Sequence, residues 1–156
     1  MGQSAFPHYA VSRVCHAGRD IIVNPDLHEL LQYRMERARE TLDEALLLSH
    51  AKHWNACANR LYYACFYAVS ALLAAHHFSA SKHSGVRSFF GQHFIKTGVF
   101  PKEMGEFYNQ LYACREVSDY EDFYQARPEE IQPWLEKSKG FVEAIQLHLD
   151  FQKGQK

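Results

Sequence analysis

The chain of 156 residues is long enough for one domain with a sizeable core, and its 47% hydrophobic and 22% charged residues are typical of a globular protein. A net charge of −1 gives no sign of a general polyanion binder. No apolar run approaches the roughly 20 residues of a membrane span, and the N-terminus carries no signal-peptide pattern. We therefore expect a cytoplasmic protein without membrane association.

The cysteines and histidines suggest no ligand-binding centre. The four cysteines are widely spaced and include no C-x-x-C pair, which argues against a disulfide framework or a zinc knuckle. Cys57 and Cys65 fall in an apolar segment, where we expect buried, inert thiols. The ten histidines show no H-x-x-x-H or H-x-x-E spacing, so we predict no metal and no cofactor.

The chain opens with an extension and a first amphipathic helix. Residues 1–25 lack a clear period and contain two prolines, so we expect a partly ordered or flexible extension with no hairpin signal. Asp26 and Glu29 are placed like a helix N-cap and its third residue. Apolar residues then recur at steps of three and four up to Ser49, which predicts a long amphipathic helix.

The second helical segment, His53–Phe78, differs in kind because it is apolar on nearly every side. Arg60 is its only formally charged residue. A helix with this pattern is enclosed by neighbours, which predicts a place at the centre of a bundle or at a subunit interface.

Three further helices are expected after a break at Ser79–Gly85: Val86–Thr97, Pro101 to about Val117, and Pro128 into a charged C-terminal tail. The predicted fold class is all-α, an antiparallel bundle of four to five helices over residues 26–152.

Acidic residues are unevenly distributed. No Asp or Glu occurs between Ala45 and Lys102, although the same stretch holds several lysines and arginines and six histidines. Such a segment would suit a phosphate-bearing partner. It would equally mark the core, where few charges of either sign belong. Composition leaves both interpretations open.

Arg60 is the residue that most needs an explanation. A guanidinium stays charged at any useful pH, so on this helix it must meet an acidic group or a phosphate, or reach the surface at a cleft. Tyr67 returns to the same helix face seven residues later, and Asn59 is the neighbour of Arg60. A structural ion pair and a phosphate-binding role both fit this pattern.

Arg115 and Asp119 form a second candidate pair, spaced as neighbours on one helix face. They would make an ion pair that fixes the turn before the last helix. Alternatively, Arg115 would line the same cleft as Arg60.

The segment Ala58–Leu73, ANRLYYACFYAVSALL, resembles the signature helix of HEPN domains. More narrowly, it looks like small HEPN proteins that are often paired with a minimal nucleotidyltransferase. Three further stretches fit that branch in the same order: Lys82–Val86 running into Phe90–Phe94, Lys96–Gly98 before Pro101, and Arg115 with Ser118–Tyr120 and Asp122–Phe123. The resemblance covers roughly Leu27–Leu149.

This resemblance implies a toxin-like helical protein that forms a homodimer and acts with a nucleotidyltransferase-type partner. In active members of the family, an R-x(4–6)-H motif from each subunit forms a metal-independent ribonuclease site. The arginine would hold the scissile phosphate. The histidine would act as general acid or base toward the RNA 2′-hydroxyl.

The sequence departs from this motif at one position, because Tyr67 stands where the histidine is expected. A tyrosine with an ordinary pKa near 10 is a poor proton shuttle at neutral pH, although it can donate a hydrogen bond or stack on a base. His83 is expected at the start of a helix, where a capping or core-edge role is the ordinary one. Sequence alone does not place it relative to Arg60.

The resulting hypothesis is a HEPN protein that binds RNA or nucleotide through Arg60, with ribonuclease activity in doubt. The candidate catalytic residues are Arg60, Tyr67 and Asn59, and the candidate phosphate- or RNA-binding residues are Arg60, Lys82, His83 and Arg115. The alternative is a non-catalytic nucleotide-binding or protein-interaction module.

Overall fold

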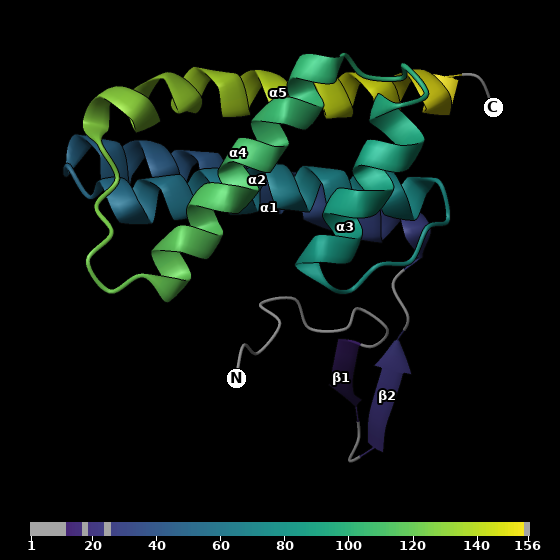
Figure 1. The fold of residues 1–156 in the computed structure, drawn as a ribbon. Coiled ribbons are helices and arrows are strands. Elements are labelled where there is room, and N and C mark those ends of the chain that lie inside the picture. The colour runs from purple at the N-terminus through teal and green to yellow at the C-terminus, as the bar shows by residue number, and fades with distance from the viewer. Residues whose placement is uncertain (1–11, 17–18, 24–25, 155–156) are drawn as a thin grey trace.

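A computed structural model describes residues 12–16, 19–23 and 26–154, with side chains from residue 26 onward. The part after residue 26 is a helical bundle, which confirms the all-α prediction (Figure 1). Its helices are α1 (Leu27–His50), α2 (Trp54–Ala75), α3 (His83–Phe90) with the π-helical turn η1 (Gly91–Ile95), α4 (Lys102–Tyr120) and α5 (Pro128–Gly154). Within the described residues, no helix combines the length and apolar character that a bilayer crossing requires.

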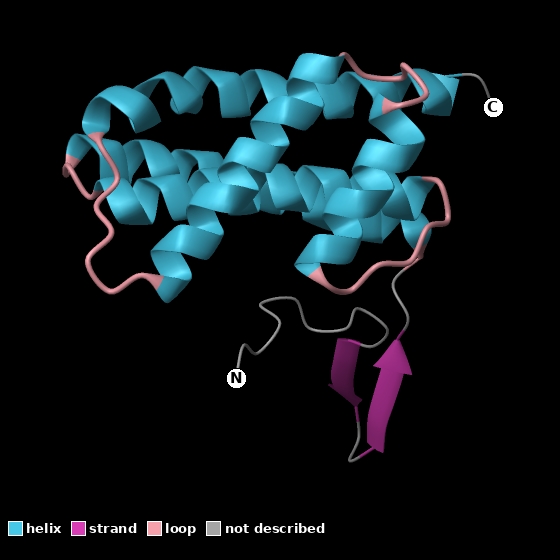
Figure 2. Ribbon diagram, viewed as in Figure 1, coloured by secondary structure: helices cyan, strands magenta, loops and turns pink. Residues whose placement is uncertain are grey.

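A short β-hairpin precedes the bundle (Figure 2). Strand β1 (Ser12–His16) pairs antiparallel with β2 (Arg19–Val23), and Ser12 lies opposite Val23. The expectation of no hairpin is therefore wrong for these residues. The strands are five residues long and do not alternate apolar and polar residues cleanly, so the pattern was not visible. The predicted order of the rest of residues 1–25 lies outside the described residues.

Helix α2 is the centre of the bundle, as its composition predicted. It contacts α1, α3, α4 and α5, and most of its residues from Leu61 to Leu73 are buried. Helices α3 and α4 cross over α2 on one side, whereas α1 and α5 lie alongside it (Figure 1). A helix with almost no charge is stable here because its neighbours remove nearly all of its surface from water.

Two of the neighbouring helices run in the same direction. At the start of α2, the Asn55 side chain accepts a hydrogen bond of 2.6 Å from the Ala126 backbone N–H, just before α5. At the other end, the Nε2 atoms of His76 and His148 lie 3.4 Å apart. Helices α2 and α5 are therefore parallel and in direct contact, and α4, which lies between them in the chain, crosses over α2 (Figure 1). The short α1–α2 turn makes that pair antiparallel, as expected.

Helix α2 ends at Ala75, three residues earlier than predicted, because the backbone turns left-handed at His77. The N–H of Phe78 donates to the Leu73 carbonyl at 2.9 Å, and that of His77 donates to the Ala74 carbonyl at 3.0 Å. These two bonds define a Schellman cap. Helix α1 ends in the same way, with Lys52 at a φ of 62°. Neither position holds glycine, so the usual stop signal is missing from the sequence.

Other boundaries shift by a few residues. Helix α3 begins at His83 rather than Val86 and includes Gly85, and its π-helical turn ends at Ile95 rather than Thr97. Helix α4 continues to Tyr120 instead of ending near Val117. Serine and glycine have low helix propensity, so the sequence predicts a loop where α3 in fact begins.

The left-handed residue after α1 gives a stability prediction. Replacing Lys52 with glycine removes the steric cost of a Cβ at φ 62°. We expect the free energy of unfolding in urea to rise by about 0.5–1 kcal/mol. The matched control, Ala51→Gly at the right-handed C-cap position, should lower it. A loss of stability in Lys52→Gly would contradict the capping geometry.

Candidate functional site

Arg60 lies on α2 at the edge of the core, with 34% of its side chain exposed. Its Nη2 donates to Asn59 Oδ1 at 3.0 Å, and its Nη1 lies 3.5 Å from Glu44 Oε2 on α1. The guanidinium thus lies near a carboxylate, as the ion-pair interpretation of Arg60 expects. Glu44 is 43% exposed, and ion pairs this open contribute roughly 0–1 kcal/mol. A phosphate could therefore compete with Glu44 for the same guanidinium.

Tyr67 has a different environment on the same helix face. It is 8% exposed, and the guanidinium carbon of Arg37 lies 5.4 Å from its ring centroid. Seven residues separate Arg60 from Tyr67 on α2, and seven separate their α1 neighbours, Arg37 and Glu44. The antiparallel helix pair thus gives Arg60 an acidic partner and Tyr67 a basic one. Tyr67 is largely enclosed at the α1–α2 interface.

The Tyr63 ring contacts both of the predicted phosphate-binding arginines, Arg60 and Arg115. The Arg60 guanidinium carbon lies 5.1 Å from the Tyr63 ring centroid, and that of Arg115 on α4 lies 5.9 Å from the same centroid. Arg115 also lies 5.4 Å from the Tyr62 ring. All three contacts are within the range of a cation–π interaction. Two positive charges from different helices therefore both contact one half-buried aromatic ring.

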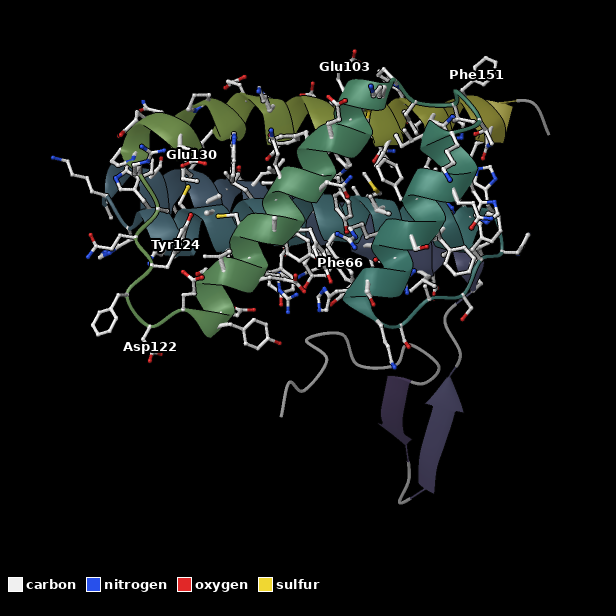
Figure 3. All side chains as sticks on the ribbon, in the orientation of Figure 1. Phe66, Glu103, Asp122, Tyr124, Glu130 and Phe151 are labelled. Carbon is white, nitrogen blue, oxygen red and sulfur yellow. The ribbon has the colours of Figure 1, made fainter. Side chains whose placement is uncertain are left out.

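His83, the first residue of α3, completes this group. Its Nδ1 lies 2.8 Å from the Tyr62 hydroxyl, and its ring centroid lies 4.6 Å from that of Phe66 and 5.8 Å from that of Tyr63. Figure 3 shows Phe66 on α2 between α3 and α4. We call Arg60, Tyr63, His83 and Arg115 the Arg60 patch.

The remaining predicted residues lie beside the patch. Lys82 is exposed and precedes α3 as its N-cap residue. Arg115 Nε lies 3.4 Å from Asp119 Oδ2, although this buried Nε has no well-aligned hydrogen-bond acceptor within the described residues. The Arg115–Asp119 contact is therefore an ion pair without good hydrogen-bond geometry. Arg115 takes part in this pair and lines the patch at the same time.

The patch keeps His83 uncharged at neutral pH. Burial and the positive charge of Arg115 lower the pKa of His83 to about 4, while Asp119 acts in the opposite direction. Burial raises the pKa of Tyr62, so its phenol keeps its proton. A neutral imidazole has one donor and one acceptor nitrogen. His83 can therefore exchange a proton with a ligand while its other nitrogen stays bonded to Tyr62.

Tyr63 and Tyr62 were not among the predicted site residues. Their role depends on which side chains of α3 and α4 pack over α2, and no local pattern reports that. The only local signal is their position in the same segment as Arg60, two and three residues later.

The hollows between α1 and α5 lie apart from the patch. One of about 510 Å³ and one of about 410 Å³ are separated by Arg39 and Gln146, which are bonded at 3.0 Å. None of the predicted site residues lines either hollow. Among residues whose side chains are described, no group of three or more His, Cys, Asp or Glu residues could hold a metal.

The class of protein that these features define is an α-helical bundle in which an arginine of the central helix meets a second arginine and aromatic rings at the edge of the core. The HEPN domain family model matches residues 31–148, and the chain belongs to this family. The segment Ala58–Leu73, on which the resemblance was based, lies inside the matched region.

Several relatives resemble the chain over most of its length. A "UPF0332 protein" of Thermotoga maritima is 43% identical over 76% of this chain and 89% of its own length. Two proteins of Methanocaldococcus jannaschii also match. "Putative toxin MJ0142" is 31% identical over 76% of this chain and 81% of its own length. "Putative toxin MJ0605" is 30% identical over 82% of this chain and 95% of its own length.

The charges around His83 give a titration prediction. Arg115→Gln removes a positive neighbour, so we expect the pKa of His83 to rise above its value of about 4. Asp119→Asn removes a negative neighbour and should lower it further. The imidazole proton resonances of His83, followed by NMR against pH, measure both shifts. Equal pKa values in the two variants would contradict the arrangement.

The same shift predicts how stability depends on pH. Between the ordinary histidine value of 6.5 and about 4, the unfolded chain binds a proton at His83 that the folded chain does not. The free energy of unfolding should therefore fall as the pH drops through this window. His83→Gln should flatten that part of the curve, whereas the control His50→Gln, on the exposed last turn of α1, should not.

Proposed function

We propose that the chain is the toxin-like component of a two-component module with a nucleotidyltransferase-type partner. In this proposal it acts in the cytoplasm as a homodimer and binds RNA or nucleotide phosphate through the Arg60 patch. Support for the toxin-like role comes from membership of the HEPN family and from two relatives that are named putative toxins.

The carrying observation is the convergence of Arg60 and Arg115 on Tyr63. Guanidinium groups bind phosphate oxygens through paired, charge-assisted hydrogen bonds. The aromatic ring that both arginines contact belongs to the residue type on which bases stack in single-strand binding. Lys82 adds a third positive charge next to the patch in the chain.

The acid-free stretch of sequence is consistent with this proposal. It includes α2, where most of the residues are core, and it also includes Lys82 and His83 at the start of α3. The core interpretation of that stretch fits α2, and we propose the phosphate-binding interpretation for the start of α3. Glu44, the acidic partner of Arg60, comes from α1 just before the stretch begins.

The alternative, a non-catalytic interaction module in which Arg60 is structural, is favoured by one observation. Arg60 already has Glu44 at 3.5 Å and Asn59 at 3.0 Å. Binding and stability measurements separate the two functions, because a structural arginine affects unfolding more than ligand affinity.

Arg60→Ala should weaken the binding of a short single-stranded RNA by about tenfold, the effect of losing one charge-assisted phosphate contact of about 1.4 kcal/mol. Fluorescence anisotropy of a labelled oligonucleotide measures the change. Arg127→Ala is the matched control, because Arg127 is 72% exposed, forms its own surface ion pair and lies outside the patch. Arg115→Ala should resemble Arg60→Ala.

The salt dependence of binding provides a second readout. Loss of one phosphate contact should reduce the slope of log affinity against log salt concentration by about 0.7, the value for a single strand. If Arg60→Ala and Arg127→Ala bind RNA equally well, Arg60 does not contact phosphate and the alternative function stands.

Growth of expressing cells tests the toxin-like role separately. We expect expression of the unchanged chain to slow growth and Arg60→Ala to relieve the effect. Harmless expression of both forms, at matched protein levels, would contradict that role.

A further inference from the structure

We propose that His83 supplies the proton-transfer group of the Arg60 patch, so that the domain cleaves single-stranded RNA without the histidine that the HEPN motif places on α2. This inference rests on the proposed function, because it requires an RNA phosphate bound at the Arg60 patch. It assigns to α3 the chemical role that position 67 on α2 lacks.

His83 has the position that this role needs. Its ring lies 5.8 Å from that of Tyr63, and the Tyr63 ring in turn contacts both arginines. Tyr67, in contrast, is largely enclosed against Arg37. His76 and His148 pair with each other at the far end of α2. The imidazole of His83 therefore approaches the same Tyr63 ring as the two cations that would hold the phosphate, and it feels the charge of Arg115.

The hydrogen bond to Tyr62 orients the ring. With Nδ1 at 2.8 Å from the phenol oxygen, Nε2 is the nitrogen that is left for a substrate. When His83 accepts a proton at Nε2, both nitrogens carry hydrogen, and Nδ1–H donates to the Tyr62 oxygen. Tyr62 thus acts as a positioning residue that stabilises the protonated ring.

The proposed step is transesterification within the RNA. His83 Nε2 removes the proton of a 2′-hydroxyl, and the 2′-oxygen forms a bond to the adjacent phosphorus. The bond from phosphorus to the 5′-oxygen breaks, and that oxygen takes a proton from water. The products are a 2′,3′-cyclic phosphate and a 5′-hydroxyl end. Arg60 and Arg115 stabilise the negative charge that develops on the phosphate oxygens.

The charges around His83 should raise its pKa, and so its strength as a base, when substrate binds. The groups that face His83 are Tyr62 and Tyr63 from α2, and Arg115 and Asp119 from α4. In the free protein, Arg115 opposes protonation of the ring. A bound phosphate offsets the charge of Arg115, so the imidazole should bind a proton more readily in the complex.

Cleavage and binding of the same RNA test the proposal together. Labelled single-stranded RNA is incubated in EDTA with the unchanged chain, with His83→Gln and with the control His50→Gln, all purified in parallel. We expect His83→Gln to slow cleavage by about 100-fold or more, as expected for loss of a general base. RNA affinity should fall far less than the cleavage rate, because both arginines remain. His50→Gln should cleave at the unchanged rate.

A substrate change verifies the chemistry. One 2′-deoxy nucleotide at the cleavage position should abolish the cut there and leave binding intact. The unchanged RNA should yield a 2′,3′-cyclic phosphate. Equal cleavage by His83→Gln and the unchanged chain would overturn the role of His83. RNA binding without cleavage by any form would overturn it too, while leaving the proposed function in place. Absence of RNA binding would overturn both.

Discussion

The enclosure of α2 determines how the rest of the molecule is built. A helix with one formally charged residue can be stable only if its neighbours cover it, and four helices do so. That cover has to open at Arg60, because a guanidinium cannot be left in an apolar core without a partner. The opening lies at the edge of the core, where Glu44, Asn59 and Tyr63 surround the guanidinium. One charge on a buried helix therefore fixes where the bundle leaves α2 partly open to solvent.

The patch draws on three helices, each of which contributes a different property. Helix α2 supplies Arg60 and the aromatic ring, α4 supplies a second cation, and α3 supplies an imidazole. Burial and Arg115 keep His83 neutral, and both arginines contact the ring of Tyr63, which carries no charge. An anion that enters this group meets two cations and a neutral proton acceptor. Proximity of these groups depends on how α3 and α4 cross α2, not on spacing along the chain.

The sequence predicts those features of the fold that depend on a few neighbouring residues, such as the starts of helices. Asp26 caps α1 through a 2.8 Å bond from the Glu29 N–H, and α5 begins at Pro128, as expected. The left-handed caps at Lys52 and His77 carried no glycine, so helix ends were less well predicted than starts. For the site, Arg60 stood out because its charge conflicts with its helix. Its relation to His83 and Arg115 depends on tertiary packing, and the sequence pattern contains no measure of that.

The most direct test of this account is to map where RNA contacts the chain. Addition of a short single-stranded oligonucleotide to isotope-labelled protein should shift the NMR resonances of Arg60, Tyr63, His83 and Arg115 together, with small changes elsewhere. The same spectra report on the hollows between α1 and α5, which contain none of these residues. Shifts confined to the α1–α5 side, or no shifts at saturating RNA, would contradict the claim that the Arg60 patch is the functional site.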